Sequence, residues 1–276
     1  MITGKTKLLG IFGCPVEHSL SPVMHNSVFQ KLRLDYVYLP FLVHPKEICQ
    51  AVQSIRTLGI KGVNVTVPHK EKIIRYLDSV SEEAKRIGAV NTVLNKNGML
   101  TGFNTDYYGF LESVEKHFSI KRKTAFMLGC GGAAKAMLFA LLDSGIKTIY
   151  ISDVEPAKSK ELRKRSGSLS NIFVVDSGNI DVVAAECDML INATPIGMKK
   201  GDGSPFNKKA IRPGCFIFDA VYNRKTLLSK YASDKNASYI NGLEMLALQG
   251  AKSFEIWTGI KPPVSFMVKI IREELK

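Results

Sequence analysis

The apolar residues of this chain fall into short strand-like runs that alternate with longer stretches of helical spacing. In the first part of the chain the runs are rich in β-branched side chains, and the stretches between them repeat apolar residues every three or four positions. Strands are predicted at 8–12, 36–43 and 62–67, and helices at 22–32 and 45–58. Such alternation indicates βαβ units and a mostly parallel sheet.

Residues 88–103 break this alternation with two short apolar runs on either side of Asn97-Gly98. The Asn-Gly pair favours the tight turn of a two-residue β-hairpin, so an antiparallel pair of strands is predicted here. A helix from Thr105 to Phe118 follows, and after it comes a basic linker.

A second alternating series starts at Thr124. Its predicted strands are 124–128, 147–152, 172–175, 188–191 and 215–219, and its predicted helices are 132–144 and 156–165, with two more at 243–256 and 263–274. Because 276 residues are many for one hydrophobic core, the two series predict an α/β protein of two domains.

Composition is that of an ordinary globular protein, with 45% hydrophobic and 23% charged residues. No apolar run approaches the ~20 residues that a membrane-spanning helix requires, and Met1 to Lys7 lack the apolar core of a signal peptide. The five cysteines are scattered without a CxxC pair, which is typical of reduced thiols in a cytoplasmic protein. No His, Cys and Asp cluster has ligand spacing, so no metal is expected.

The net charge of +13 raises the question of an anionic partner. Nucleic-acid binding predicts basic residues interleaved with aromatic residues on one element. Here the densest basic runs are Lys121 to Lys123 and the solvated helical stretch Lys158 to Arg165. Nucleic acid is therefore disfavoured, and attraction of an anionic substrate and a phosphate-bearing cofactor is the better use of this charge.

The segment NVTVPHK, residues 64–70, carries the first candidate chemistry. Successive strand residues face opposite sides, so Asn64 and Thr66 share one face, and Pro68 ends the strand just before Lys70. An amide, a hydroxyl and an amine in one place suit a polyhydroxylated or carboxylated small molecule. A buried strand whose polar residues are satisfied by neighbouring backbone accounts for the same pattern, and the segment alone does not decide between the two.

A glycine-rich turn lies between a predicted strand and a predicted helix of the second series. In such turns one glycine permits the tight bend, a second lets a pyrophosphate approach the backbone, and the helix N-terminus holds the phosphate oxygens. Ala134 stands where the GxGxxG pattern ends in glycine or alanine. The candidates for cofactor binding here are Gly129, Cys130, Gly131, Gly132 and Ala133.

The next predicted strand ends at Asp153, about twenty residues beyond the glycines. A carboxylate at this place accepts hydrogen bonds from the adenosine ribose hydroxyls and repels a 2′-phosphate. Val154 and Glu155 follow it, and Lys158 offsets the second negative charge that Glu155 adds. A helix N-cap ahead of Pro156 is a second role for Asp153, and the two roles are compatible.

Further motifs complete a pattern whose specificity lies in their order along the chain. They are HSLSP at 18–22, GAVNT at 88–92, GFNTD at 102–106, NATPIGM at 192–198 and NGLEM at 241–245 followed by Gln249. Together with NVTVPHK and the GxGGAA turn they closely resemble the shikimate dehydrogenase family over essentially the whole chain. The resemblance implies an N-terminal α/β substrate domain, residues 1–106 plus 243–276, and a doubly wound Rossmann dinucleotide-binding domain, residues 107–242.

The same resemblance implies roles for single side chains. Lys70 and Asp106 would form the catalytic pair, and Ser19 and Ser21 would hold the substrate carboxylate. The other implied substrate contacts are Asn64, Thr66, Asn91, Tyr222 and Gln249, and the positions near the nicotinamide are Ala220 and Gly242. Ketone reduction needs a proton on oxygen, which an ammonium at Lys70 can donate and Asp106 can orient. The sequence leaves open whether Lys70 donates that proton or is chiefly an electrostatic clamp.

The implied activity is the reversible NAD(P)-dependent reduction of 3-dehydroshikimate to shikimate in chorismate and aromatic amino-acid biosynthesis. The alternatives are an enzyme that prefers NAD and quinate, and a non-catalytic dinucleotide-binding regulator, which the presence of both Lys70 and Asp106 disfavours.

Two departures from the family pattern concern the cofactor. NADP-dependent members usually have Asn-Arg-Thr where this chain has residues 153–155, so the cofactor is predicted as NADP or NAD, with a lean toward NAD or dual use. Arg224 stands where the family commonly has proline, and both a phosphate contact and a solvated side chain fit it. The oligomeric state stays open, with a homodimer among the alternatives.

Overall fold

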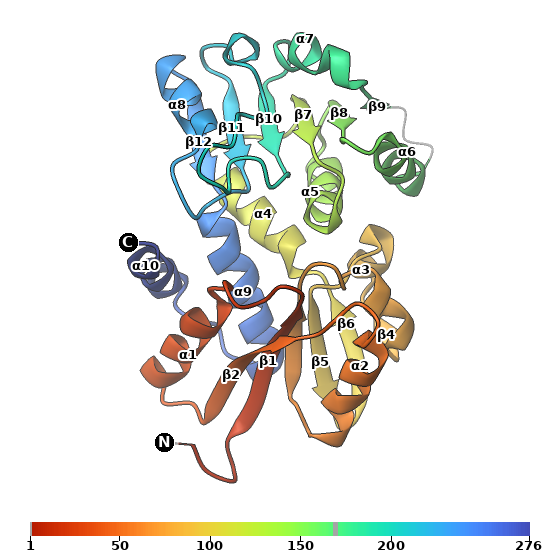
Figure 1. Ribbon diagram of the computed structural model, residues 1–276, viewed down its shortest axis with the longest axis vertical. Coiled ribbons are helices and arrows are strands. Elements are labelled where there is room, and N and C mark those ends of the chain that lie inside the picture. Colours follow the sequence, from red (N-terminus) through yellow and green to blue (C-terminus); the bar gives the residue numbers. More distant parts are fainter. Residues whose placement is uncertain (1, 168–170) are drawn as a thin grey trace. The chain divides into compact units, whose positions relative to one another are not determined.

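The computed structural model describes residues 2–167 and 171–276. These residues form two compact units, each with its own six-stranded sheet and its own helices (Figure 1). The first unit runs up to Gly109 and also includes Leu246–Lys276, and the second is Phe110–Met245. The chain passes from one unit to the other inside α4 (Thr105–Glu115) and inside α9 (Leu243–Thr258). The predicted α/β class is confirmed.

The first unit contains a mixed sheet with the strand order β2-β1-β3-β5-β6-β4. Its strands are β1 (Lys7–Gly13), β2 (Tyr36–Leu42), β3 (Gly62–Val65), β4 (Ser79–Val80), β5 (Thr92–Lys96) and β6 (Met99–Phe103). Its further helices are α1 (Ser21–Lys31), α2 (Ile48–Thr57), the 3-10 helix η1 (Lys72–Tyr76), α3 (Glu82–Ile87) and α10 (Val264–Glu274). Strands β2, β1 and β3 are parallel, whereas β5 is antiparallel to both β3 and β6.

The hairpin of β5 and β6 confirms the prediction made from Asn97-Gly98. Both residues have positive φ, 55° and 87°, as the favoured two-residue hairpin turns require. The hairpin returns the chain so that Asn91, just before β5, and the GFNTD segment at the end of β6 lie together: the Asn91 N–H donates to the Phe103 carbonyl at 3.0 Å. The turn thus positions two motifs that are separate in sequence.

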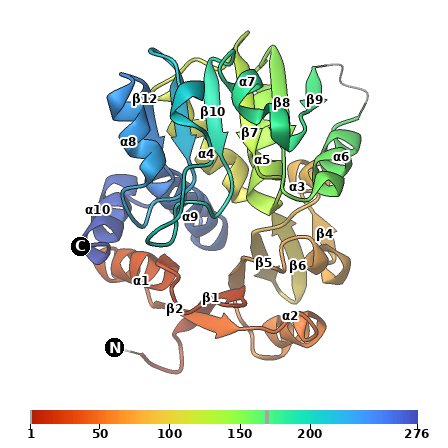
Figure 2. The same ribbon diagram turned by 45° about the horizontal axis from the view of Figure 1, so that its top comes forward.

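The second unit contains a wholly parallel sheet with the strand order β12-β11-β10-β7-β8-β9, which is labelled in Figure 1 and appears in a tilted view in Figure 2. Its strands are β7 (Thr124–Leu128), β8 (Thr148–Ser152), β9 (Ile172–Val174), β10 (Met189–Asn192), β11 (Phe216–Asp219) and β12 (Ser238–Asn241). Its helices are α5 (Gly132–Asp143), α6 (Pro156–Arg165), α7 (Ile180–Ala184) and α8 (Leu227–Asp234), with the 3-10 helices η2 (Ser177–Asn179) and η3 (Lys208–Ala210).

This order is that of a doubly wound Rossmann sheet, because it reverses direction between β7 and β10. Ligands of such sheets bind outside the carboxyl ends of the strands at the point of reversal, and the glycine turn directly follows β7 there. The Rossmann prediction is confirmed. Within the described residues, no helix is both long and apolar enough to span a membrane.

Candidate active site

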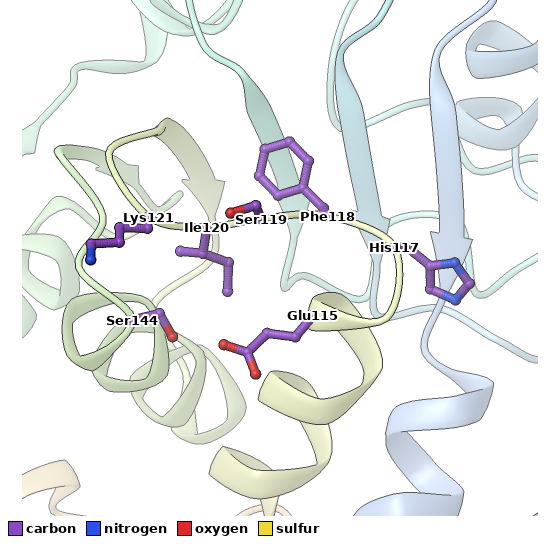
Figure 3. A pocket seen from close by; sticks show the side chains of 7 residues that line it. All are labelled: Glu115, His117, Phe118, Ser119, Ile120, Lys121 and Ser144. Atoms are coloured by element: carbon purple, nitrogen blue, oxygen red, sulfur yellow. The ribbon is translucent and has the colours of Figure 1, made fainter.

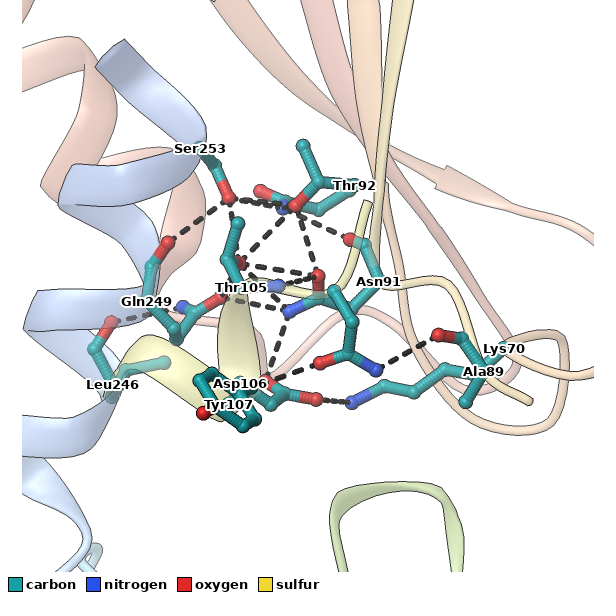
Figure 4. A network of polar contacts seen from close by, with 12 residues as sticks. Lys70, Ala89, Asn91, Thr92, Thr105, Asp106, Tyr107, Leu246, Gln249 and Ser253 are labelled. Carbon is teal, nitrogen blue, oxygen red and sulfur yellow. Dashed lines mark hydrogen bonds and ion pairs between the residues drawn. The ribbon is translucent and has the colours of Figure 1, made fainter. Parts of the chain in front are cut away.

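A lysine and a carboxylate from different segments of the first unit form an ion pair (Figure 4). Lys70 follows β3, Asp106 lies in the first turn of α4, and Lys70 Nζ is 2.6 Å from Asp106 Oδ2. Their side chains are 15% and 8% exposed. The pair is therefore shielded from most bulk water, where charges interact more strongly than on an open surface.

Asn91 holds the second oxygen of that carboxylate. Its Nδ2 donates to Asp106 Oδ1 at 2.9 Å and to Thr105 Oγ1 at 2.9 Å, and its Oδ1 accepts the backbone N–H of Thr105 at 2.7 Å. A backbone N–H only donates, so the orientation of the Asn91 amide follows from its partners. Asp106 is thus held between an ammonium and an amide.

Helix α9 brings two further side chains to this cluster, one helical turn apart (Figure 4). Gln249 Oε1 is 3.4 Å from both Asn91 Nδ2 and Thr105 Oγ1. Ser253 Oγ is 2.8 Å from Thr92 Oγ1 and 3.1 Å from Thr105 Oγ1. Residues four apart share one face of a helix, which explains why both reach the same place.

Asn64 joins the cluster from β3. Its Nδ2 is 3.1 Å from the carbonyl oxygen of Asn91, and its Oδ1 accepts the hydroxyl of Tyr38 at 2.7 Å. The side chain of Ser21 lies beside the Tyr38 hydroxyl, which brings the HSLSP motif next to Asn64. Burial raises the pKa of Tyr38 well above its ordinary value, so the phenol stays protonated and remains a donor.

Two predicted substrate contacts of this unit lie at the border of the network. Ser19 is half-buried, and its hydroxyl accepts the backbone N–H of Ser21 at 3.3 Å. Thr66 is half-buried directly after β3, and its backbone N–H donates to Phe12 at 2.9 Å. The structure therefore brings together Ser21, Asn64, Lys70, Asn91, Asp106 and Gln249, with Ser19 and Thr66 beside them in sequence.

The glycine turn of the second unit fits a pyrophosphate. Gly129 has φ +102°, and a Cβ there would lie 2.8 Å from the Ala193 carbonyl oxygen, so only glycine is accommodated. A Cβ at Gly131 would meet nothing within 4 Å, which shows open space over the backbone. Helix α5 begins at Gly132 without a side-chain cap, so its first N–H groups face this space uncapped.

Cys130 and Asp153 connect this turn to the end of β8. Asp153 Oδ2 accepts the Cys130 N–H at 2.7 Å, and Oδ1 accepts the Glu155 N–H at 2.9 Å. The N-cap residue of α6 is Glu155, so Asp153 is not the cap itself. Burial raises the pKa of the Cys130 thiol to about 11, which keeps it a neutral packing group.

The two residues after Asp153 carry no positive charge. Val154 is 89% exposed, and Glu155 Oε1 is 2.6 Å from Lys158 Nζ. The lysine that was expected to offset Glu155 is thus paired with it.

The predicted nicotinamide-side residues lie in the loops after β11 and β12. A Cβ at Gly242 would lie 2.3 Å from the Ala220 carbonyl oxygen, so glycine is required where these two strand ends meet. Tyr222 is half-buried, and burial raises its pKa. Arg224, for which the sequence left two roles open, donates to the carbonyl of Lys199 and so ties this loop to the segment after NATPIGM.

A separate surface pocket of the second unit contains none of these residues (Figure 3). In it Glu115 and Ser144 point towards one another from the ends of α4 and α5. Its lining residues are Glu115, His117, Phe118, Ser119, Ile120, Lys121 and Ser144. No group of three or more potential metal ligands occurs in the described part of the chain.

Four polar residues of the network were not predicted as site residues: Tyr38, Thr92, Thr105 and Ser253. Thr92 and Thr105 belong to the GAVNT and GFNTD motifs, and Ser253 follows Gln249 by one helical turn, so spacing alone could have found these three. Tyr38 sits in an apolar strand, where nothing in the sequence distinguishes it from a core residue.

The first unit has a buried lysine–carboxylate pair set among amides and hydroxyls, and the second has a Rossmann sheet whose glycine turn has room for a pyrophosphate. These features define a class of protein, the dinucleotide-dependent oxidoreductases. Comparison with known proteins narrows the class. Residues 11–93 match the family described as the shikimate dehydrogenase substrate binding domain, and residues 242–272 match the shikimate 5'-dehydrogenase C-terminal domain.

Proteins that match this chain over nearly its full length are named for the same family. Shikimate dehydrogenase (NADP(+)) of Desulforamulus reducens is 40% identical over 99% of this chain and 97% of its own. The crystal structure of shikimate dehydrogenase from Aquifex aeolicus has a TM-score of 0.92 at 38% identity, covering 99% of this chain and 100% of its own. Shikimate 5-dehydrogenase from Listeria monocytogenes, in complex with shikimate and NAD, has a TM-score of 0.89 at 38% identity, covering 98% of both. The chain belongs to the shikimate dehydrogenase family.

Proposed function

We propose that the protein is a shikimate dehydrogenase that interconverts 3-dehydroshikimate and shikimate with a nicotinamide dinucleotide. One observation carries the proposal: Lys70 Nζ is 2.6 Å from Asp106 Oδ2, and Asn91 donates to the other oxygen of the same carboxylate. A regulator that only binds a dinucleotide has no need of a buried ion pair of this kind, whereas proton transfer to a ketone oxygen does.

The two units take different parts of this task. We assign substrate binding to residues 1–106 plus 243–276 and dinucleotide binding to residues 107–242. In support, these bounds lie within three residues of those of the two units. We assign substrate contacts to the predicted set: Ser19, Ser21, Asn64, Thr66, Asn91, Tyr222 and Gln249. In support, Asn91 donates to Asp106 of the ion pair, and Asn64 and Gln249 both bond Asn91.

The residues of this chain transfer the proton, and they orient the group that carries it. In the oxidation of a secondary alcohol, the carbinol C–H leaves as hydride and the O–H leaves as a proton, and the bound dinucleotide supplies the hydride acceptor. In oxidation the hydroxyl proton passes to Lys70 Nζ, and in reduction Nζ returns a proton to the ketone oxygen. Asp106 fixes the direction of Nζ and stabilises its positive charge.

For the cofactor we propose NAD or use of both dinucleotides. Asp153 stands at the end of β8, and the exposed Val154 and the acidic Glu155 follow it, so no arginine is available at these positions for a 2′-phosphate. The Desulforamulus relative is named for NADP(+) and the Listeria structure contains NAD. The residues that we expect to hold the dinucleotide are Gly129, Cys130, Gly131, Gly132, Ala133, Asp153, Val154, Glu155, Lys158, Ala220 and Gly242.

Asp153→Ala is expected to lower the ratio of kcat/KM for NAD⁺ to kcat/KM for NADP⁺ by about tenfold, because two ribose hydrogen bonds are lost and a repulsion of the 2′-phosphate is relieved. Both values will fall somewhat, since the Cys130 N–H also loses its acceptor. Initial rates with each cofactor measure the ratio, and Asp176→Ala, an exposed acid beyond β9, is the control. An unchanged ratio would mean that Asp153 only braces the glycine turn.

The proposal as a whole is tested by an initial-rate matrix of shikimate and quinate against NAD⁺ and NADP⁺. Turnover of shikimate at a kcat/KM well above that of quinate supports it. Preference for quinate would assign the protein to the quinate-using branch, and binding of a dinucleotide without turnover of either acid would favour a regulator.

A further inference from the structure

The amide of Asn64 lies between two buried hydroxyls, of Tyr38 on β2 and of Ser253 on α9. We propose that Tyr38 and Ser253 are positioning residues that hold this amide in one orientation, with its oxygen as the atom offered to substrate. The inference rests on the proposed function, in which Asn64 contacts the substrate, and adds what that contact must be.

The orientation follows from partners whose roles are unambiguous. Asn64 Nδ2 is 3.1 Å from the carbonyl oxygen of Asn91, which only accepts, so the nitrogen must face that side. Nδ2 is also 3.1 Å from Thr92 Oγ1 and 3.0 Å from Ser253 Oγ. Its two protons therefore have three acceptors within the protein, and none remains for a ligand.

The Tyr38 hydroxyl must then donate to Asn64 Oδ1, at 2.7 Å. Tyr38 is rigidly placed. Asn26 binds its backbone N–H and carbonyl at 2.9 Å each, and the ring of His25 stacks on it at 4.6 Å between centroids. The direction of this hydroxyl is thus set before any ligand arrives.

Ser253 acts from the other side of the amide. Its hydroxyl donates to the backbone carbonyl of Gln249 at 3.0 Å, so its oxygen is left to accept from Asn64 Nδ2, which is 3.0 Å away. The hydroxyls of Thr92 and Thr105 lie 2.8 and 3.1 Å from the same oxygen. Its side chain is completely buried, and hydrogen bonds formed away from water are stronger than exposed ones.

These hydrogen bonds leave Asn64 one free acceptor site for the ligand. The second lone pair of Asn64 Oδ1 is the remaining hydrogen-bonding capacity of this amide, so the substrate group next to it must be a hydrogen-bond donor, such as a ring hydroxyl. The fixed amide discriminates against a carbonyl or ether oxygen at that place, because two acceptors would face each other.

The test uses Tyr38→Phe and Ser253→Ala in the full-length protein, with Tyr36→Phe and Ser113→Ala as matched controls. Tyr36 lies two residues from Tyr38 on the same strand, and the buried Ser113 bonds the Phe110 carbonyl of its own helix. Each network variant is expected to raise KM for shikimate by about five- to tenfold, the effect of one lost hydrogen bond, with little change in dinucleotide Kd. The controls are expected to leave both values as in the wild type.

If Tyr38 or Ser253 only stabilised the fold, its replacement would lower the melting temperature and its effect on KM would not depend on Asn64. Each variant is therefore also made in an Asn64→Ala background. There Tyr38→Phe and Ser253→Ala should raise KM no further, because their partner is gone. Additive effects in that background, or a wild-type KM in both single variants, would overturn the proposal. If the wild-type protein itself fails to turn over shikimate, the proposed function fails instead, and that measurement is made first.

Discussion

Replacing Lys70 by alanine is expected to lower kcat for shikimate oxidation by about 10³-fold, in the range that general acid–base groups contribute. The variant loses both the base on the hydroxyl proton and the positive charge next to the developing ketone oxygen. Lys70 and the glycine turn belong to different units, so the Kd for the dinucleotide should change by no more than about twofold. Single-turnover rates and fluorescence titration measure the two quantities.

Two further variants separate the roles of this lysine. Lys72→Ala removes an exposed lysine two residues away and should leave kcat unchanged. Lys70→Arg keeps the positive charge but replaces the amine by a guanidinium that does not release a proton near neutral pH. We expect its kcat to stay as low as that of Lys70→Ala. Recovery by arginine would assign Lys70 to electrostatic stabilisation, and wild-type turnover in Lys70→Ala would refute the catalytic pair.

Much of the fold was predictable from the sequence because its main elements bury one face or both. The runs that became β1, β2 and β3, and those that became β7 and β8, are apolar enough to stand out from their surroundings. The short elements were missed. Strand β4 has two residues and α7 has five, which is too few for a period to be recognised. Strand β12 has the sequence SYIN, whose polar ends conceal it, and α8 carries only two buried residues.

The candidate site was predictable to a different extent. The family resemblance implied that Lys70, Asn91 and Asp106 share one site, and in the structure the hairpin of β5 and β6 brings the last two together. Hydrogen-bond direction could not be predicted, because it depends on which atom of each amide faces which neighbour. The hydrogen bond of Asp153 could not be predicted either. Its carboxylate accepts the N–H of Cys130, which lies 23 residues earlier in the chain, and no local sequence pattern indicates such a contact.

The free energy of unfolding is expected to fall as the pH is lowered from 6.5 towards 3, because of one buried histidine. His25 is completely buried, its ring lies 4.6 Å from that of Tyr38 and 5.5 Å from that of Trp257, and neither ring nitrogen has a hydrogen-bond partner among the described residues. Burial lowers its pKa from 6.5 to about 3, because the charged form cannot be solvated there. The unfolded chain therefore binds a proton in this range that the folded protein does not.

The sign follows from proton linkage. The stabilisation is complete above pH 6.5 and is lost as the pH falls towards about 3, at roughly 1.4 kcal/mol of unfolding free energy per pH unit and on the order of 5 kcal/mol in total. Urea unfolding from pH 7 to pH 4, followed by a probe in the first unit, measures it, and His25→Phe should reduce the slope by that amount. Carboxylates that titrate in the same range are common to both proteins and cancel in the difference.

Phe29→Leu, in the same aromatic cluster, should lower stability equally at every pH, because it removes packing and no titratable group. Equal slopes for the wild type and His25→Phe would show that the buried ring can take up a proton without cost.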